Sequence, residues 1–161
     1  GQLPQLLERM RAARVGGALC ISVTLTDLPA VLALAENHRQ LWATVGVHPD
    51  YPDIAEPDVA TLVRLAQHPR VRAIGETGLD YYRLTGDLDW QRERFRVHIR
   101  AARAVQMPLD AHSRFTFWPG FGCCVVAALS GASIWDHTED DNEDCPILHK
   151  WHEYCLYLFH V

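Results

Sequence analysis

The chain has 161 residues, of which 48% are hydrophobic and 22% charged, and its formal net charge is -5. This composition is typical of one globular domain with enough apolar residues for a core, and it excludes disordered, collagen-like and disulfide-scaffold proteins. No apolar run approaches the roughly 20 residues that span a bilayer, and no secretory signal is recognisable, so we expect no membrane partner.

Helices and strands alternate along the first half of the chain. Apolar residues at three- and four-residue spacing predict a first helix that ends near Gly16, and a short apolar strand follows over 17–23. Asp27 is the expected N-cap of a second helix, and the strand over 41–47 comes next. Pro57 is expected in the first turn of a third helix.

The same alternation continues to residue 114. Residues 71–75 form a third apolar strand, a long helix begins near Asp87 or Asp89, and a short strand covers 108–112. The arginines of the long helix are expected to form a solvated face rather than a track for DNA; they are Arg92, Arg94, Arg96, Arg100 and Arg103. Strands that alternate with helices through short connections predict βαβ units and a parallel sheet.

The pattern stops after Arg114, and the composition changes at the same point. Of the 15 basic residues only Lys150 lies in 115–161, which also holds four of the five cysteines. We therefore predict a folded part over 1–114 and an atypical tail of uncertain structure over 115–161, in which residues 125–129 form either a strand or a helix turn. Because five cysteines cannot all pair, we expect reduced thiols and a cytoplasmic location.

The tail contains side chains that can bind zinc. Four of them lie within eleven residues, but their spacing matches no common zinc finger and a helix would place only some on one face; they are Cys145, His149, His152 and Cys155. A zinc site there is the less favoured interpretation, and His137 is expected to be a loop histidine.

Three polar residues follow three successive strands directly. His48, Glu76 and His112 each come at the end of an apolar run, which in a parallel sheet is the carboxyl edge where ligands bind. Imidazole and carboxylate ligands suit Zn, Mn, Fe or Ni. Capping of a strand end explains one such residue, whereas three in equivalent positions favour a shared site.

Three sequence blocks resemble the TatD family of metal-dependent hydrolases. They are Gly-Val-His-Pro at 46–49, Ile-Gly-Glu-Thr-Gly-Leu-Asp-Tyr-Tyr at 74–82, and Pro-Leu-Asp-Ala-His-Ser-Arg at 108–114. The resemblance covers about residues 1–114 and implies deoxyribonuclease-type chemistry. It also implies the fold class, an α/β partial TIM (β/α) barrel that comprises parallel strands two to five with flanking helices.

The resemblance further implies a role for each matching residue. Glu76 matches a carboxylate that bridges two divalent metal ions, and His112 matches a histidine ligand. His48 matches an active-site histidine near the substrate, so the expected catalytic set is His48, Glu76 and His112. Asp80 and Arg114 face the phosphate or support the ligands; alternatively, Asp80 only fixes its loop and Arg114 only pairs with a carboxylate. Zn, Mg and Mn are equally compatible with this set.

The sequence also departs from the family pattern. Members open with a strand that carries His-x-His, and their later Phe-His-Cys-Phe and Glu-Thr-Asp blocks do not occur after Arg114 here. Asp110 stands where the family usually has an apolar residue. We therefore expect an incomplete TatD-like hydrolase that cleaves phosphodiesters such as DNA. The alternative is a catalytically inactive half-barrel that binds partners or self-associates through an exposed sheet edge.

Overall fold

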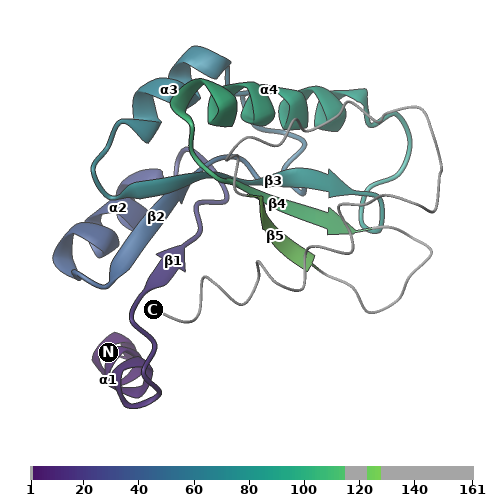
Figure 1. Cartoon of the computed structure of the whole chain (residues 1–161). Helices are drawn as coiled ribbons and strands as arrows, with labels where there is room; N and C mark the ends of the chain where they lie inside the picture. The colour runs from purple at the N-terminus through teal and green to yellow at the C-terminus, as the bar shows by residue number, and fades with distance from the viewer. Residues whose placement is uncertain (1, 115–122, 128–161) are drawn as a thin grey trace. The chain divides into compact units, whose positions relative to one another are not determined.

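The computed structural model describes residues 2–114 and 123–127, with side chains described for residues 2–112 (Figure 1). Helices and strands follow one another in the order α1 (Gln2–Ala12), β1 (Ala18–Cys20), α2 (Leu28–Asn37), β2 (Leu41–Val45), α3 (Val59–Ala66), β3 (Val71–Asp80), α4 (Asp89–Val105), β4 (Leu109–Arg114) and β5 (Cys123–Ala127). None of the described helices is long and apolar enough to cross a membrane. The chain divides into two compact units; α1 lies in one, and the other extends from Leu19 to Ser130.

The five strands form one sheet in their sequence order, β1-β2-β3-β4-β5 (Figure 1). β2 pairs in parallel with β3, which places Ala43 beside Val71, and β3 pairs in parallel with β4. A helix connects β1 to β2, β2 to β3 and β3 to β4, as in a (β/α) barrel. The prediction of four adjacent parallel strands with flanking helices is confirmed. Residues 125–127, for which a strand and a helix turn were both open, belong to β5, a strand antiparallel to β4.

One hydrophobic core lies between the sheet and the helices α2, α3 and α4. Ala43 and Val45 of β2 face this core, and Trp42 and Thr44, which alternate with them, belong to the other face of the strand. Leu62 of α3 and Ile74 of β3 are completely buried at its centre. The core therefore fixes which face of each strand is turned towards the helices.

Two helix starts differ in detail from expectation. Asp27 does precede α2, but its carboxylate accepts a hydrogen bond from the Thr24 hydroxyl at 2.7 Å and makes no cap bond to the helix. α3 begins at Val59 rather than at Pro57, because the Asp58 carboxylate accepts the backbone N–H of Thr61 at 2.6 Å.

The prediction of a solvated arginine face on α4 is wrong for Arg94. This residue is 2% exposed, and Gln91 and His98 beside it on the helix are completely buried. Residues 91, 94 and 98 are spaced by three and four, so they share the face of α4 that is turned into the molecule. Arg100, in contrast, keeps a side chain that is 56% exposed.

Two glycines let the middle of β3 approach β4 and the segment after β2 closely. Gly75 has a φ of +142°, and a Cβ atom there would lie 2.2 Å from the carbonyl oxygen of Asp110 in β4. A Cβ atom on Gly46 would lie 2.5 Å from the carbonyl carbon of Gly75. Because Gly75 directly precedes Glu76, this close packing determines where β3 presents that carboxylate.

A pair of alanine substitutions separates the effect of close packing from that of backbone conformation. Gly75 and Gly86 both have positive φ, but a Cβ atom on Gly86 would meet nothing within 4 Å. We expect Gly86→Ala to lower the unfolding free energy by about 1 kcal/mol through backbone strain alone. Gly75→Ala adds overpacking and should cost about 3 kcal/mol or more. Urea denaturation measures both, and equal losses would contradict the packing argument.

Candidate metal centre

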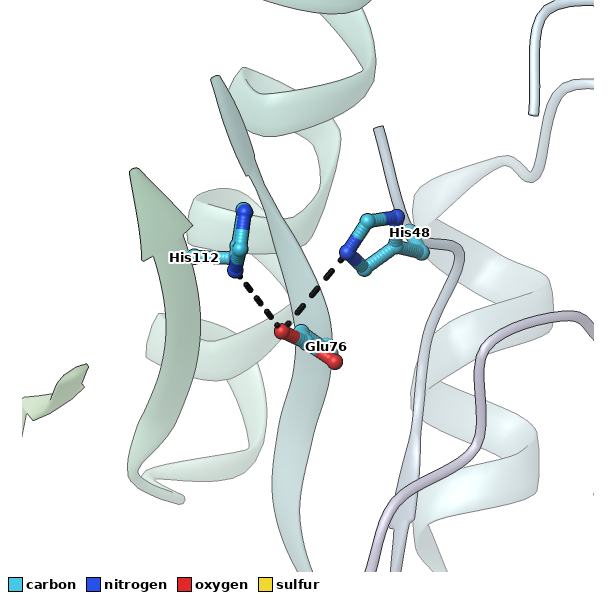
Figure 2. A group of neighbouring side chains, drawn as sticks. All are labelled: His48, Glu76 and His112. Carbon is cyan, nitrogen blue, oxygen red and sulfur yellow. Dashed lines mark ion pairs between the residues drawn. The ribbon is translucent and has the colours of Figure 1, made fainter. Parts of the chain in front are cut away.

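The three residues that the sequence places at strand ends do lie together in the structure. His48 comes from the loop after β2, whereas Glu76 and His112 lie within β3 and β4, because both strands extend further than predicted. Figure 2 shows the carboxylate of Glu76 directed between the two imidazole rings. The backbone of His112 lies in the paired register of β4 with β3, whereas Glu76 lies where that register shifts, and its N–H donates to the carbonyl oxygen of Ser22 at 3.2 Å.

The distances within the cluster are short. The Glu76 Oε1 atom is 3.2 Å from His112 Nδ1 and 3.7 Å from His48 Nε2 (Figure 2). One ligand atom from each residue can be chosen so that all lie within 4.8 Å of one another. The side chains are only 13–16% exposed. Nitrogen and oxygen donors at this spacing suit a divalent cation, so the chemistry of the donor set fits a metal ion.

The hydrogen bonds of His48 determine its tautomer. The backbone N–H of Asp50 donates to His48 Nδ1 at 3.1 Å, so that nitrogen carries a lone pair and no proton. Burial lowers the pKa of His48 against the opposing effect of Glu76, which favours the neutral ring. A neutral ring with a bare Nδ1 carries its proton on Nε2, so His48 presents an N–H donor towards Glu76.

Asp80 lies behind His112 and is completely buried. Its Oδ1 atom accepts the backbone N–H groups of Tyr82 and Arg83, both at 2.9 Å, and thereby holds the loop after β3. Its Oδ2 atom is 3.9 Å from His112 Nε2. Neither Asp80 Oδ2 nor His112 Nε2 has a hydrogen-bond partner. Asp80 therefore fixes its loop and faces a candidate ligand at the same time.

Other candidates from the sequence are less informative in the structure. Arg114 pairs beside Asp80 in the backbone register of β4 and β3, but its side chain is outside the described part of the chain. Asp110 is 1% exposed in β4, two residues before His112. The possible zinc ligands of the tail also lie outside the described residues, as does His137; they are Cys145, His149, His152 and Cys155.

Sequence reasoning missed the buried polar residues of α4 that contact the loop of His48. Arg94 donates from Nη1 to the carbonyl oxygen of His48 at 2.9 Å, and His98 Nε2 accepts the backbone N–H of Val47 at 3.0 Å. Their spacing of four along α4 is the signal that was available, since it places both on one helix face.

A parallel half-barrel that brings carboxylate and imidazole side chains together at one end of its sheet is an arrangement compatible with metal-dependent hydrolases. A family model described as TatD related DNase matches residues 1–125. The chain belongs to this TatD family, and the resemblance noted in the sequence is thereby confirmed.

Individual relatives agree with the family assignment. The chain is 33% identical to the uncharacterized metal-dependent hydrolase YabD of Bacillus subtilis over 70% of this chain and 44% of that protein. It is 35% identical to the 3'-5' ssDNA/RNA exonuclease TatD of Citrobacter rodentium over 69% and 44%. The crystal structure of YJJV, a TatD homologue from Escherichia coli, matches with a TM-score of 0.59 at 29% identity, over 72% of this chain and 46% of that one. The chain thus spans less than half the length of these relatives.

His98 makes the stability of the fold depend on pH. Its Nδ1–H donates to the carbonyl oxygen of Arg94 at 2.8 Å while Nε2 accepts from Val47, so the folded protein requires a neutral ring. Burial lowers the pKa of His98 to about 4. Between pH 6.5 and 4 the unfolded chain binds a proton that the folded chain does not bind, so stability falls as the pH is lowered through this range.

Replacing His98 with Gln should remove this component of the pH dependence. Gln keeps an oxygen that can accept the N–H of Val47 but has no proton to gain in this range. From pH 7 to pH 5 we expect the wild type to lose about 2 kcal/mol more unfolding free energy than His98→Gln, on the basis of 1.4 kcal/mol for each pH unit. Denaturant titrations at several pH values measure this, and parallel profiles for the two proteins would contradict it.

Proposed function

We propose that this chain provides part of a metal-dependent active centre that hydrolyses phosphodiester bonds of DNA. The observation that carries the proposal is the position of Glu76 Oε1, which faces an imidazole nitrogen of His112 at 3.2 Å in a half-buried site. A carboxylate removed from water beside imidazole nitrogen is stabilised by a cation. The nuclease names of the relatives support the same substrate class.

Glu76 and His112 are the proposed metal ligands. Glu76 offers a carboxylate that can bridge two divalent ions, and His112 offers Nδ1, because its Nε2 is turned towards Asp80. When bound, such ions supply positive charge for the phosphodiester and lower the pKa of bound water. Zn, Mg and Mn all suit these ligands, and two ions is the number that the family assignment favours.

His48 is proposed as a hydrogen-bond donor rather than a third ligand. Its Nδ1 accepts the N–H of Asp50, so Nε2 carries the proton and has no lone pair for a metal. An N–H group at this position can donate a hydrogen bond to a phosphate oxygen or to the leaving oxygen and stabilise the charge that develops there. His48 would therefore act on the substrate and not on the ion.

Asp80 and Arg114 complete the proposed centre. Asp80 Oδ2 would accept the Nε2 proton of His112 and so hold its Nδ1 lone pair towards the metal, an arrangement common behind histidine ligands. Arg114 would face the substrate phosphate from the end of β4. A single-stranded DNA partner and a cytoplasmic location are part of the same proposal.

A second candidate function is suggested by the open sheet. Because β1 and β5 are its outermost strands among the described residues, an inactive half-barrel that binds a partner or self-associates is the alternative. The two candidates differ in metal binding, because a module that only associates through a sheet edge has no need of Glu76.

Glu76→Gln tests the proposal directly. Gln keeps the shape of the side chain but removes its charge, so the unfolding free energy should change by less than about 1 kcal/mol whereas the affinity for Mn²⁺ should fall about 100-fold. Isothermal titration with Mn²⁺ measures the affinity. Cleavage of a single-stranded oligonucleotide should fall in parallel wherever the wild type has activity.

The matched control is Glu36→Gln. Glu36 also contacts a histidine, His68 at 3.0 Å, but its side chain is 56% exposed. This variant should bind Mn²⁺ as the wild type does. Equal affinities for wild type and Glu76→Gln would contradict the ligand assignment, and no Mn²⁺ binding by the wild type would favour the inactive module.

A further inference from the structure

We propose that Arg94 and His98 of α4 form a clamp that sets the orientation and tautomer of His48 and acts as a positioning device for the active centre. The inference rests on the proposed function for its biological meaning, but its test does not require catalysis. Arg94 and His98 do not contact the ligand atoms themselves. They act through the backbone of the loop that carries His48.

The loop of His48 needs such support because it lies outside the sheet. β2 ends at Val45, so no strand pairing holds the residues that follow, whereas His112 is paired with Gly78 in the register of β4 with β3. From the sheet side the loop receives one backbone bond near the site, from the N–H of His48 to the carbonyl oxygen of Val23 at 3.0 Å. The orientation of the imidazole therefore depends on contacts from elsewhere.

Arg94 supplies two of these contacts, one at each end of a turn. Its Nη1 donates to the carbonyl oxygen of His48, and its Nη2 donates to that of Tyr51, both at 2.9 Å. Between them lies Asp50, whose N–H donates to His48 Nδ1. By holding both ends of the turn, the guanidinium keeps the N–H of Asp50 directed at the ring, and that bond determines the tautomer of His48.

The guanidinium is itself held rigidly. Glu56 accepts from Arg94 Nε at 2.8 Å and from Nη2 at 2.6 Å, while the ring of Trp90 lies 4.7 Å from the central carbon of the guanidinium. The Arg94 side chain is 1% exposed, and the paired carboxylate balances its charge. This use of a planar fork with several donors is available to arginine and not to lysine.

His98 extends the clamp by one residue towards β2. Its Nδ1–H donates to the carbonyl oxygen of Arg94, and its Nε2 accepts the N–H of Val47, which directly precedes His48. The two clamp residues are thus linked to each other and to consecutive residues of the loop. Together they hold the N–H of Val47 and the carbonyl group of His48.

The experiment compares Arg94→Lys with Arg100→Lys on the same helix. Arg100 pairs with Glu93 at 2.8 Å on the exposed side, so its replacement is a control for the loss of a guanidinium from α4. Two-dimensional ¹H–¹⁵N spectra of the histidine rings, recorded without metal near pH 7, report which nitrogen of His48 carries the proton. Unfolding free energy and Mn²⁺ affinity are measured on the same samples.

We expect His48 of the wild type and of Arg100→Lys to show a protonated Nε2 and a bare Nδ1. In Arg94→Lys the ratio of the tautomers should move about tenfold towards a protonated Nδ1, as expected for loss of one directed hydrogen bond. The affinity for Mn²⁺ should change less than about threefold, because the clamp holds the loop of His48, which is not one of the proposed ligands. An unchanged tautomer ratio in folded Arg94→Lys would overturn the clamp, and so would an equal shift in Arg100→Lys.

Glu56→Gln keeps the test decisive if Arg94→Lys does not fold. Glu56 is partly exposed and contacts the guanidinium from outside, so its replacement loosens Arg94 without removing it. A shift in the same direction, of about threefold, supports the clamp, and no shift overturns it. Failure of the proposed function is separate, because it appears as Mn²⁺ affinity that does not depend on Glu76.

Discussion

An excess of negative charge at the carboxyl edge of the sheet is the constraint on which the site depends. Glu76 is 13% exposed and Asp80 is completely buried, yet both lie within 4 Å of the same histidine, His112. His48 does not balance them, because burial lowers its pKa and favours the neutral ring. Carboxylates brought together out of water repel one another unless a cation is near. The fold thus creates a demand for positive charge that a divalent ion can meet.

The topology explains why α4 carries the groups that support this site. In a βαβ unit the helix runs antiparallel to the strands, so the first half of α4 lies beside the carboxyl ends of β3 and β4. Its buried polar residues Gln91 and Arg94 belong to that half and His98 follows at the middle of the helix, whereas Ala101 and Ala102 of the second half pack in the core. Gln91 accepts the N–H of Asp80 at 2.9 Å. The second half of α4 therefore packs in the hydrophobic core, and the first half bonds to the backbone of Asp80 and of the loop that carries His48.

Periodicity and position in the chain predicted the architecture and the three residues that meet at the sheet edge. Apolar runs identify buried strands, and in a parallel sheet the end of a strand identifies the shared edge, so His48, Glu76 and His112 were within reach of sequence reasoning. The burial of Arg94 could not be predicted from the sequence in the same way. Four other arginines lie on the same helix, and its carboxylate partner is 38 residues away in the sequence. Its other partners are backbone carbonyl groups, which every residue has and which a sequence pattern therefore does not reveal. The start of α3 was missed by two residues because Asp58, and not Pro57, supplies the cap.

The tautomer of His48 has a consequence for the metal. The residues that could hold an ion are His48, Glu76 and His112. On the proposed assignment only Glu76 and His112 would bind it, because Nδ1 of His48 is occupied by the N–H of Asp50. The placement of these two ligands then decides how well they bind an ion, since groups that are already in position lose less conformational entropy on binding. His112 is placed by the register of β4 with β3, and Glu76 is placed by Gly75, which packs closely against Asp110 of β4. On that assignment the close packing at Gly75 is part of the metal chemistry as well as of the fold.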